Sequence, residues 1–154
     1  MAVLERNKSG DFAVLGRFFA KRQQERDLVF RILEVDYYQN ADNSVLADCL
    51  NGDYRRVIVD YGSMTEAGLC DCARCDRKVI VGALSEWKAE AFLEALKMDG
   101  KRDKSWKYAV SFGSEETRKE LERMFHVHCL RIPASVDAFA VTRADMDFFR
   151  RILE

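Results

Sequence analysis

Short strand-like runs alternate along this chain with amphipathic helical segments, and this alternation is the feature that most limits the fold. It is typical of α/β proteins, in which helices cover both faces of a parallel sheet. We therefore expect a three-layer α/β/α fold with a mainly parallel sheet. The expected strands are residues 2–5, 29–33, 56–60, 78–82, 108–111 and 127–131, and the polar character of the last predicts an edge strand.

Helices are expected between these strands, and their starts carry capping signals. Ser85 and Ser114 stand where N-caps are favoured, and Thr142 with Asp145 three residues later resembles a capping box. No internal repeat or linker interrupts the pattern, so residues 1–154 are predicted to form a single domain. The expected helices are residues 13–24, 43–50, 65–71, 85–98, 114–125 and a last one after Thr142.

The composition narrows the classes of function. The 25 Lys and Arg residues balance 26 Asp and Glu residues, which argues against a dedicated nucleic-acid binder. No run of 18 apolar residues predicts a membrane span, and the first residues lack the apolar core of a signal peptide. We therefore expect a cytoplasmic protein whose five cysteines are reduced.

Residues 56–62 read Arg-Val-Ile-Val-Asp-Tyr-Gly, an apolar strand that leads into an acid and then a glycine. An acid at the C-terminal end of a buried parallel strand lies where open α/β sheets bind ligands. Gly62 would allow a backbone N–H to approach a phosphate closely. A site for Mg²⁺ at Asp60 is one interpretation, and an Asp60 that caps the following turn is the other.

The cysteine cluster suggests a second kind of site. Cys70, Cys72 and Cys75 lie close in sequence, and thiolates bind Zn²⁺. The paired C-x₂-C units that are typical of structural zinc sites are absent, so incidental thiols are the simpler interpretation. A small zinc-binding α/β module remains an alternative. Arg118, His126 and His128 are interpreted as surface residues.

The order of the motifs resembles that of MinD/ParA-type P-loop NTPases. Residues 2–12 resemble the strand that ends in D-x-D-P-x-G, with Glu5 and Asn7 at the two acidic positions, and residues 57–62 resemble the Walker B strand. Three later segments also resemble family strands: 75–82, 108–111, whose end at Ser111 would approach the nucleotide base, and 130–133, which ends at Pro133. The resemblance implies a P-loop NTPase-like fold.

The departures from the family pattern bear on activity. Residues 1–154 contain no G-x-x-x-x-G-K-[ST], and the family's first strand, Walker A P-loop and first helix have no counterpart in them. Because phosphoryl transfer depends on that loop and its lysine, the resemblance implies a pseudo-NTPase that acts in protein interaction or regulation, with no cofactor expected. Alternatively, a longer native chain or a partner supplies the P-loop, and the assembly binds Mg-ATP as an active ATPase.

The absent strand has a structural consequence. In the family the P-loop strand lies beside the Walker B strand, so its loss leaves backbone N–H and C=O groups unpaired there. We expect either a closed-up sheet or association across this edge, with a protein partner or a second copy of the chain.

Overall fold

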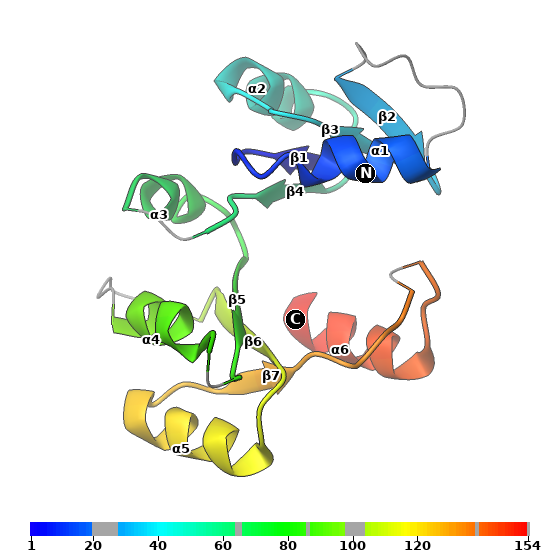
Figure 1. Cartoon of the computed structure of the whole chain (residues 1–154). Coiled ribbons are helices and arrows are strands. Elements are labelled where there is room, and N and C mark those ends of the chain that lie inside the picture. Colours follow the sequence, from blue (N-terminus) through cyan, green and yellow to red (C-terminus); the bar gives the residue numbers. More distant parts are fainter. Residues whose placement is uncertain (20–27, 64–65, 86, 98–103, 138, 154) are drawn as a thin grey trace. The chain divides into compact units, whose positions relative to one another are not determined.

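The computed structural model describes residues 1–19, 28–63, 66–85, 87–97, 104–137 and 139–153, and Figure 1 shows their elements. These residues form two compact units, Met1–Cys70 and Asp71–Glu154. Strands and helices alternate in both units, so the predicted α/β class is confirmed. None of the helices in these ranges is long and apolar enough to cross a membrane.

The first unit is built on a four-stranded mixed sheet with the order β2-β3-β1-β4. The central strand β1 (Ala2–Glu5) runs parallel to β3 (Val35–Tyr38) and to β4 (Val57–Asp60), whereas β2 (Val29–Ile32) pairs with β3 in antiparallel fashion. The predicted strands at 2–5, 29–33 and 56–60 are therefore present, and β3 is a strand that the sequence pattern did not predict.

Helices cover the two faces of this sheet. Alternate residues of a strand point to opposite faces. On one face Leu4 packs in a buried cluster with Cys49 of α2 (Asn43–Asn51), whose N-cap Asp42 accepts a hydrogen bond from the Val45 N–H at 2.9 Å. On the other, Phe12 of α1 (Asp11–Phe19) meets the ring of Tyr37 edge-on, with 5.5 Å between centroids. The predicted end of α1 at residue 24 lies outside the described residues.

The second unit contains a three-stranded parallel sheet with the order β5-β6-β7. Its strands are β5 (Lys78–Ala83), β6 (Trp106–Ser111) and β7 (Cys129–Arg131), and β7 is at the edge, as predicted. Phe92 of α4 (Ala89–Lys97) packs against Gly82, while Ile152 of α6 (Arg143–Leu153) packs on Ala109 from the other face. Helix α5 (Glu115–Phe125) also belongs to this unit, whereas α3 (Glu66–Cys72) contains the boundary between the two units at Cys70.

Two of the three predicted helix starts agree with the structure. Ser114 accepts a hydrogen bond from the Thr117 N–H at 3.1 Å, and Thr142 and Asp145 exchange the reciprocal bonds of a capping box, at 2.7 and 3.3 Å. At the third start, α4 is assigned from Ala89. The Ala89 N–H donates to the Ser85 carbonyl at 3.0 Å, which is the bond that the carbonyl of an N-cap residue accepts, so Ser85 as the N-cap stays a prediction.

Candidate functional site

The carboxyl ends of β1 and β4 bring four of the predicted site residues together in the first unit. Glu5 pairs with Asp60 in the parallel ladder, and the N–H of Arg6 donates to the Asp60 carbonyl at 2.8 Å. Asn7 follows β1 and Gly62 follows β4. We refer to Glu5, Asn7, Asp60 and Gly62 as the acidic strand-end cluster. Its position is the one at which open α/β sheets bind ligands.

Glu5 is the buried member of this cluster, with no solvent exposure at all. Its Oε1 accepts hydrogen bonds from the Phe12 N–H at 3.1 Å and from the Ser9 hydroxyl at 3.3 Å. One carboxylate oxygen therefore satisfies a donor in the first turn of α1, in the way that side chains cap helix ends. The other oxygen, Oε2, has no hydrogen-bond partner within the described part of the chain.

Asn7 holds the turn between β1 and α1. Its side-chain oxygen accepts from the Ser9 N–H at 2.8 Å and from the Ser9 hydroxyl at 2.6 Å, which is the local bonding of an Asx turn. Its amide nitrogen donates to the Asp60 carbonyl at 3.3 Å. Asn7 therefore ties the end of β1 to the end of β4.

The side chain of Asp60 bonds within the turn that follows β4. Its Oδ1 accepts the N–H of Gly62 at 2.8 Å, so the structure agrees with the capping interpretation of this acid. Gly62 has a φ of +66°, a left-handed conformation that glycine adopts without cost. A Cβ at this position would lie 2.7 Å from the Cβ of Asn7. Gly62 thus lies directly against a neighbouring side chain.

Glu5 and Asp60 are the two carboxylates of this cluster. Among the residues that the structure describes, no group of three or more His, Cys, Asp or Glu side chains is placed to hold one. Mg²⁺ requires octahedral oxygen coordination and is usually bound through one or two carboxylates together with substrate phosphates. The orphan Oε2 of Glu5 and the carboxylate of Asp60 are the chemical groups that the acidic strand-end cluster offers to a ligand.

The other predicted residues of the nucleotide site, Ser111 and Pro133, belong to the second unit. Ser111 ends β6, and its hydroxyl donates to the Gly82 carbonyl on the adjacent strand at 3.3 Å. The N–H of Ile132 extends the β6–β7 ladder to the Val110 carbonyl at 2.9 Å. Pro133 follows directly after Ile132, beyond the end of β7. The hydroxyl of Ser111 is therefore bonded within its own sheet.

The predicted cysteine site lies around the end of α3. Cys70 is exposed, whereas Cys72 and Cys75 are half-buried, and all are free thiols. Among the described residues the three cysteines do not form a group placed to hold a metal ion, so the geometry adds no support to the zinc alternative.

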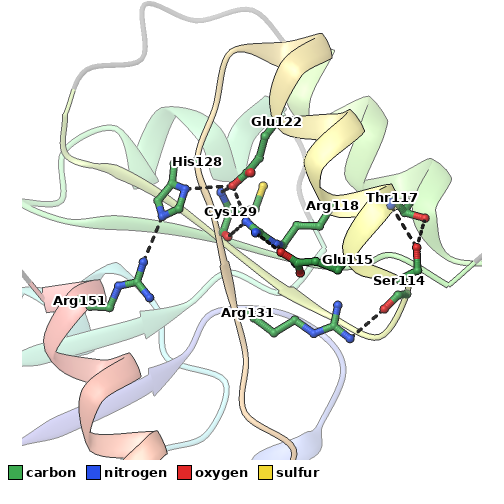
Figure 2. A network of polar contacts seen from close by, with 10 residues as sticks. Ser114, Glu115, Thr117, Arg118, Glu122, His128, Cys129, Arg131 and Arg151 are labelled. Atoms are coloured by element: carbon green, nitrogen blue, oxygen red, sulfur yellow. Dashed lines mark hydrogen bonds and ion pairs between the residues drawn. The ribbon is translucent and has the colours of Figure 1, made fainter.

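A polar network in the second unit was not predicted from the sequence (Figure 2). Arg118 of α5 is only 15% exposed, and its guanidinium donates to Glu122 at 2.6 Å and to the Cys129 carbonyl at 3.0 Å, and it also pairs with Glu115. Hydrogen bonding to Glu115 raises the pKa of Arg118, and the same bond lowers the pKa of the Glu115 carboxyl. Arg118 is therefore hydrogen-bonded to the fold, and its bond to the Cys129 carbonyl links α5 to β7.

His128 extends this network toward α6. Its Nδ1 lies 3.0 Å from Glu122 Oε1, and its Nε2 lies 3.1 Å from a nitrogen of Arg151, as Figure 2 shows. Because an arginine can only donate, Nε2 must accept, which leaves the proton on Nδ1 toward Glu122. The signal for this contact is weak in the sequence, because it depends on α5, β7 and α6 meeting in space.

A comparison with solved structures identifies a protein with a similar fold. No protein-family model and no curated protein matches the sequence. A solved structure, the crystal structure of a ParA family ATPase from Chlorobium tepidum TLS, matches 100% of this chain and 86% of that chain, with a TM-score of 0.64 and 17% identity. At this identity the likeness is one of fold. The resemblance predicted from the order of the motifs is therefore confirmed as a ParA-like P-loop NTPase fold.

Proposed function

We propose that this chain is a ParA-like domain that acts through protein interaction or regulation, with its nucleotide site weakened or lost. The single observation that carries the proposal is the internal bonding of the acidic strand-end cluster. Asp60 accepts from the Gly62 N–H, and Asn7 both packs against Gly62 and donates to the Asp60 carbonyl. The Gly62 N–H, which could meet a phosphate, and Oδ1 of Asp60, which could meet Mg²⁺, are bonded to each other within the turn after β4.

The phosphate-binding half of a nucleotide site has no candidate in residues 1–154. The turn after β1 reads Asn7-Lys8-Ser9-Gly10, in which the glycine follows the lysine and serine. A P-loop places its glycines before them, so that consecutive N–H groups form an anion nest. Binding energy for a triphosphate, and the charge stabilisation that hydrolysis needs, would have to come from other residues.

The outer edge of β4 is the surface that we assign to interaction. β4 is the last strand of its sheet, and Ile58 is 48% exposed. The Ala2 N–H donates to the Arg56 carbonyl and the Arg6 N–H to the Asp60 carbonyl, so the even-numbered residues of β4 face β1. By alternation, the N–H and C=O groups of Val57 and Val59 point away from the sheet. Such an edge favours pairing with another strand, and we assign it to a second copy of this chain.

Light scattering on purified protein tests this assignment, with Val59→Pro as the perturbation. Proline removes an outward N–H and leaves the ladder to β1 intact, as edge strands tolerate. The wild type should form a concentration-dependent dimer that Val59→Pro abolishes. Val59→Ala is the matched control, because it keeps the N–H and should still associate. A wild type that remains monomeric at high micromolar concentration would refute self-association through β4.

One observation favours a second function, an ATPase whose P-loop comes from a longer chain or a partner. Glu5 Oε2 is fully buried and unpartnered within the described residues, at the edge of the sheet where ligands bind in this fold class. A buried polar atom without a partner is costly unless a water, an ion or a ligand satisfies it. The test is ATP hydrolysis by the chain together with its partner, compared with the Glu5→Gln variant, and loss of activity in that variant would support this alternative.

A further inference from the structure

Cys72 and Cys75 form a C-x-x-C pair in the turn that leads from α3 into β5. Cys72 is the last residue of α3, and β5 begins at Lys78. Both cysteines belong to the second unit, close after the boundary that separates it from Met1–Cys70. This turn has no part in the acidic strand-end cluster, and the proposed function does not use it.

The backbone brings the two residues within disulfide range. The Cys75 N–H donates to the Cys72 carbonyl at 3.0 Å, and the preceding Arg74 N–H donates to the Asp71 carbonyl at 3.1 Å. A turn closed by such a bond keeps its first and fourth Cα atoms within roughly 7 Å. Disulfides join residues whose Cα atoms are about 4.4 to 6.8 Å apart. The pair can therefore be bridged with little movement of the backbone.

The surroundings of the pair leave it open to a small reagent. Cys72 and Cys75 are half-buried, unlike Cys49 and Cys129, which are almost fully buried. Burial, followed by the nearby Cys75, raises the pKa of the Cys72 thiol, while Lys78 acts in the opposite direction. A raised pKa lowers the fraction of Cys72 that is thiolate, the attacking form, and we assign Cys72 to the second, resolving step.

We propose that Cys72 and Cys75 form a reversible redox site whose oxidant is a low-molecular-weight disulfide of the glutathione type. The Cys75 thiolate attacks one sulfur of that disulfide, forms a mixed disulfide and releases one small thiol. The Cys72 thiolate then attacks the Cys75 sulfur and releases the second small thiol. Two protein thiols are oxidised to one disulfide, and the reagent's disulfide is reduced to two thiols. The disulfide bridges the turn that leads from α3 into β5.

Peptide mapping provides a direct test, because trypsin cleaves after Arg74, between the two cysteines. The full chain is incubated with oxidised glutathione, and the remaining thiols are alkylated under denaturing conditions before digestion. A Cys72–Cys75 disulfide then links peptide 57–74 to peptide 75–77, and the link is released by reduction. A Cys70–Cys72 disulfide lies within peptide 57–74 and gives no linked pair. Mass spectrometry distinguishes these products.

Three variants make the assignment specific. Cys70→Ser should keep the linked peptides, because the exposed Cys70 is not a member of the pair. Cys72→Ser should accumulate glutathione on Cys75, and Cys75→Ser should lose the link. Loss of the link in Cys70→Ser, or a wild type that carries only glutathione adducts or free thiols, would overturn the proposal. A linked pair found only in covalent dimers on a non-reducing gel would also overturn it.

Discussion

Replacing Gly62 by alanine should destabilise the protein through two effects that can be measured separately. The first is conformational, because a φ of +66° costs an L-residue about 1 to 2 kcal/mol. The second is steric, because the new Cβ would lie 2.7 Å from the Cβ and 2.9 Å from the Cγ of Asn7. Overpacking of this kind costs about 1 to 3 kcal/mol. The sum is a loss of about 2 to 5 kcal/mol in the free energy of unfolding.

Gly10 offers a matched control. Its φ is +73°, close to that of Gly62, but a Cβ there would meet nothing within 4 Å. Gly10→Ala should therefore cost only the conformational part, about 1 to 2 kcal/mol. Urea unfolding of both variants gives the difference, which we expect to be about 1 to 3 kcal/mol in favour of Gly10→Ala.

A double-mutant cycle with Asn7→Gly identifies the steric partner. Asn7→Gly removes both contacting carbons, so Gly62→Ala made in that background should cost no more than Gly10→Ala. Equal costs for Gly62→Ala and Gly10→Ala in the wild-type background would refute the reasoning. If Gly62→Ala costs as much in the Asn7→Gly background as in the wild type, the reasoning is also refuted. The cost would then not come from a clash between the new Cβ and Asn7.

Two further predictions concern polar side chains away from the acidic strand-end cluster. Arg118→Ala should lower the free energy of unfolding by about 2 kcal/mol, because it removes charged hydrogen bonds. Arg150→Ala should change the free energy of unfolding by less than about 0.5 kcal/mol, because Arg150 is an exposed partner of a helix-surface pair. Urea unfolding of both variants measures these losses, and equal losses would contradict the prediction. The pKa of Asp36 is lowered, first by its hydrogen bond from Arg31, so the stability that this acid contributes is present above its unfolded-state pKa and is lost as pH falls through the folded-state pKa. Asp36→Asn should therefore lower the melting temperature at pH 7. The difference in melting temperature between the variant and the wild type should narrow below about pH 4, where unfolded aspartate titrates. A difference that is independent of pH would argue against the ion pair of Asp36 with Arg31.

The parts of the fold that sequence reasoning predicted are those that local pattern determines. The apolar runs of β1 and β4 are short, are bounded by polar residues, and are parallel strands as expected. β3 was missed because its hairpin turn carries no usual turn signal. The turn residues Leu33 and Glu34 have φ values of +47° and +63°, a conformation for which Asn and Gly are favoured. Pairing with β2 and β1 outweighs the local preference of these two residues.

The candidate site shows a different limit. The sequence located Asp60 and Gly62 at the end of a strand but left two interpretations of Asp60 open. The choice depends on where one carboxylate oxygen points, and that follows from the turn after β4. Arg118 was interpreted as solvated, although Glu115 and Glu122 stand at the i, i+3 and i, i+4 spacings at which helical side chains pair. Its bond to the Cys129 carbonyl on β7 is the part that spacing along the chain cannot give, because the fold brings the two together.

The central claim is that the nucleotide site of this ParA-like fold is weakened or lost, and a thermal-shift titration with Mg-ATP tests it most directly. A ligand that binds only the folded protein adds about 2.7 kcal/mol of stability at a hundred times its Kd, which shifts the melting temperature by several degrees. We predict no saturable shift at millimolar Mg-ATP, and the same result for Asp60→Ala. A saturable shift in the wild type that Asp60→Ala abolishes would contradict the claim.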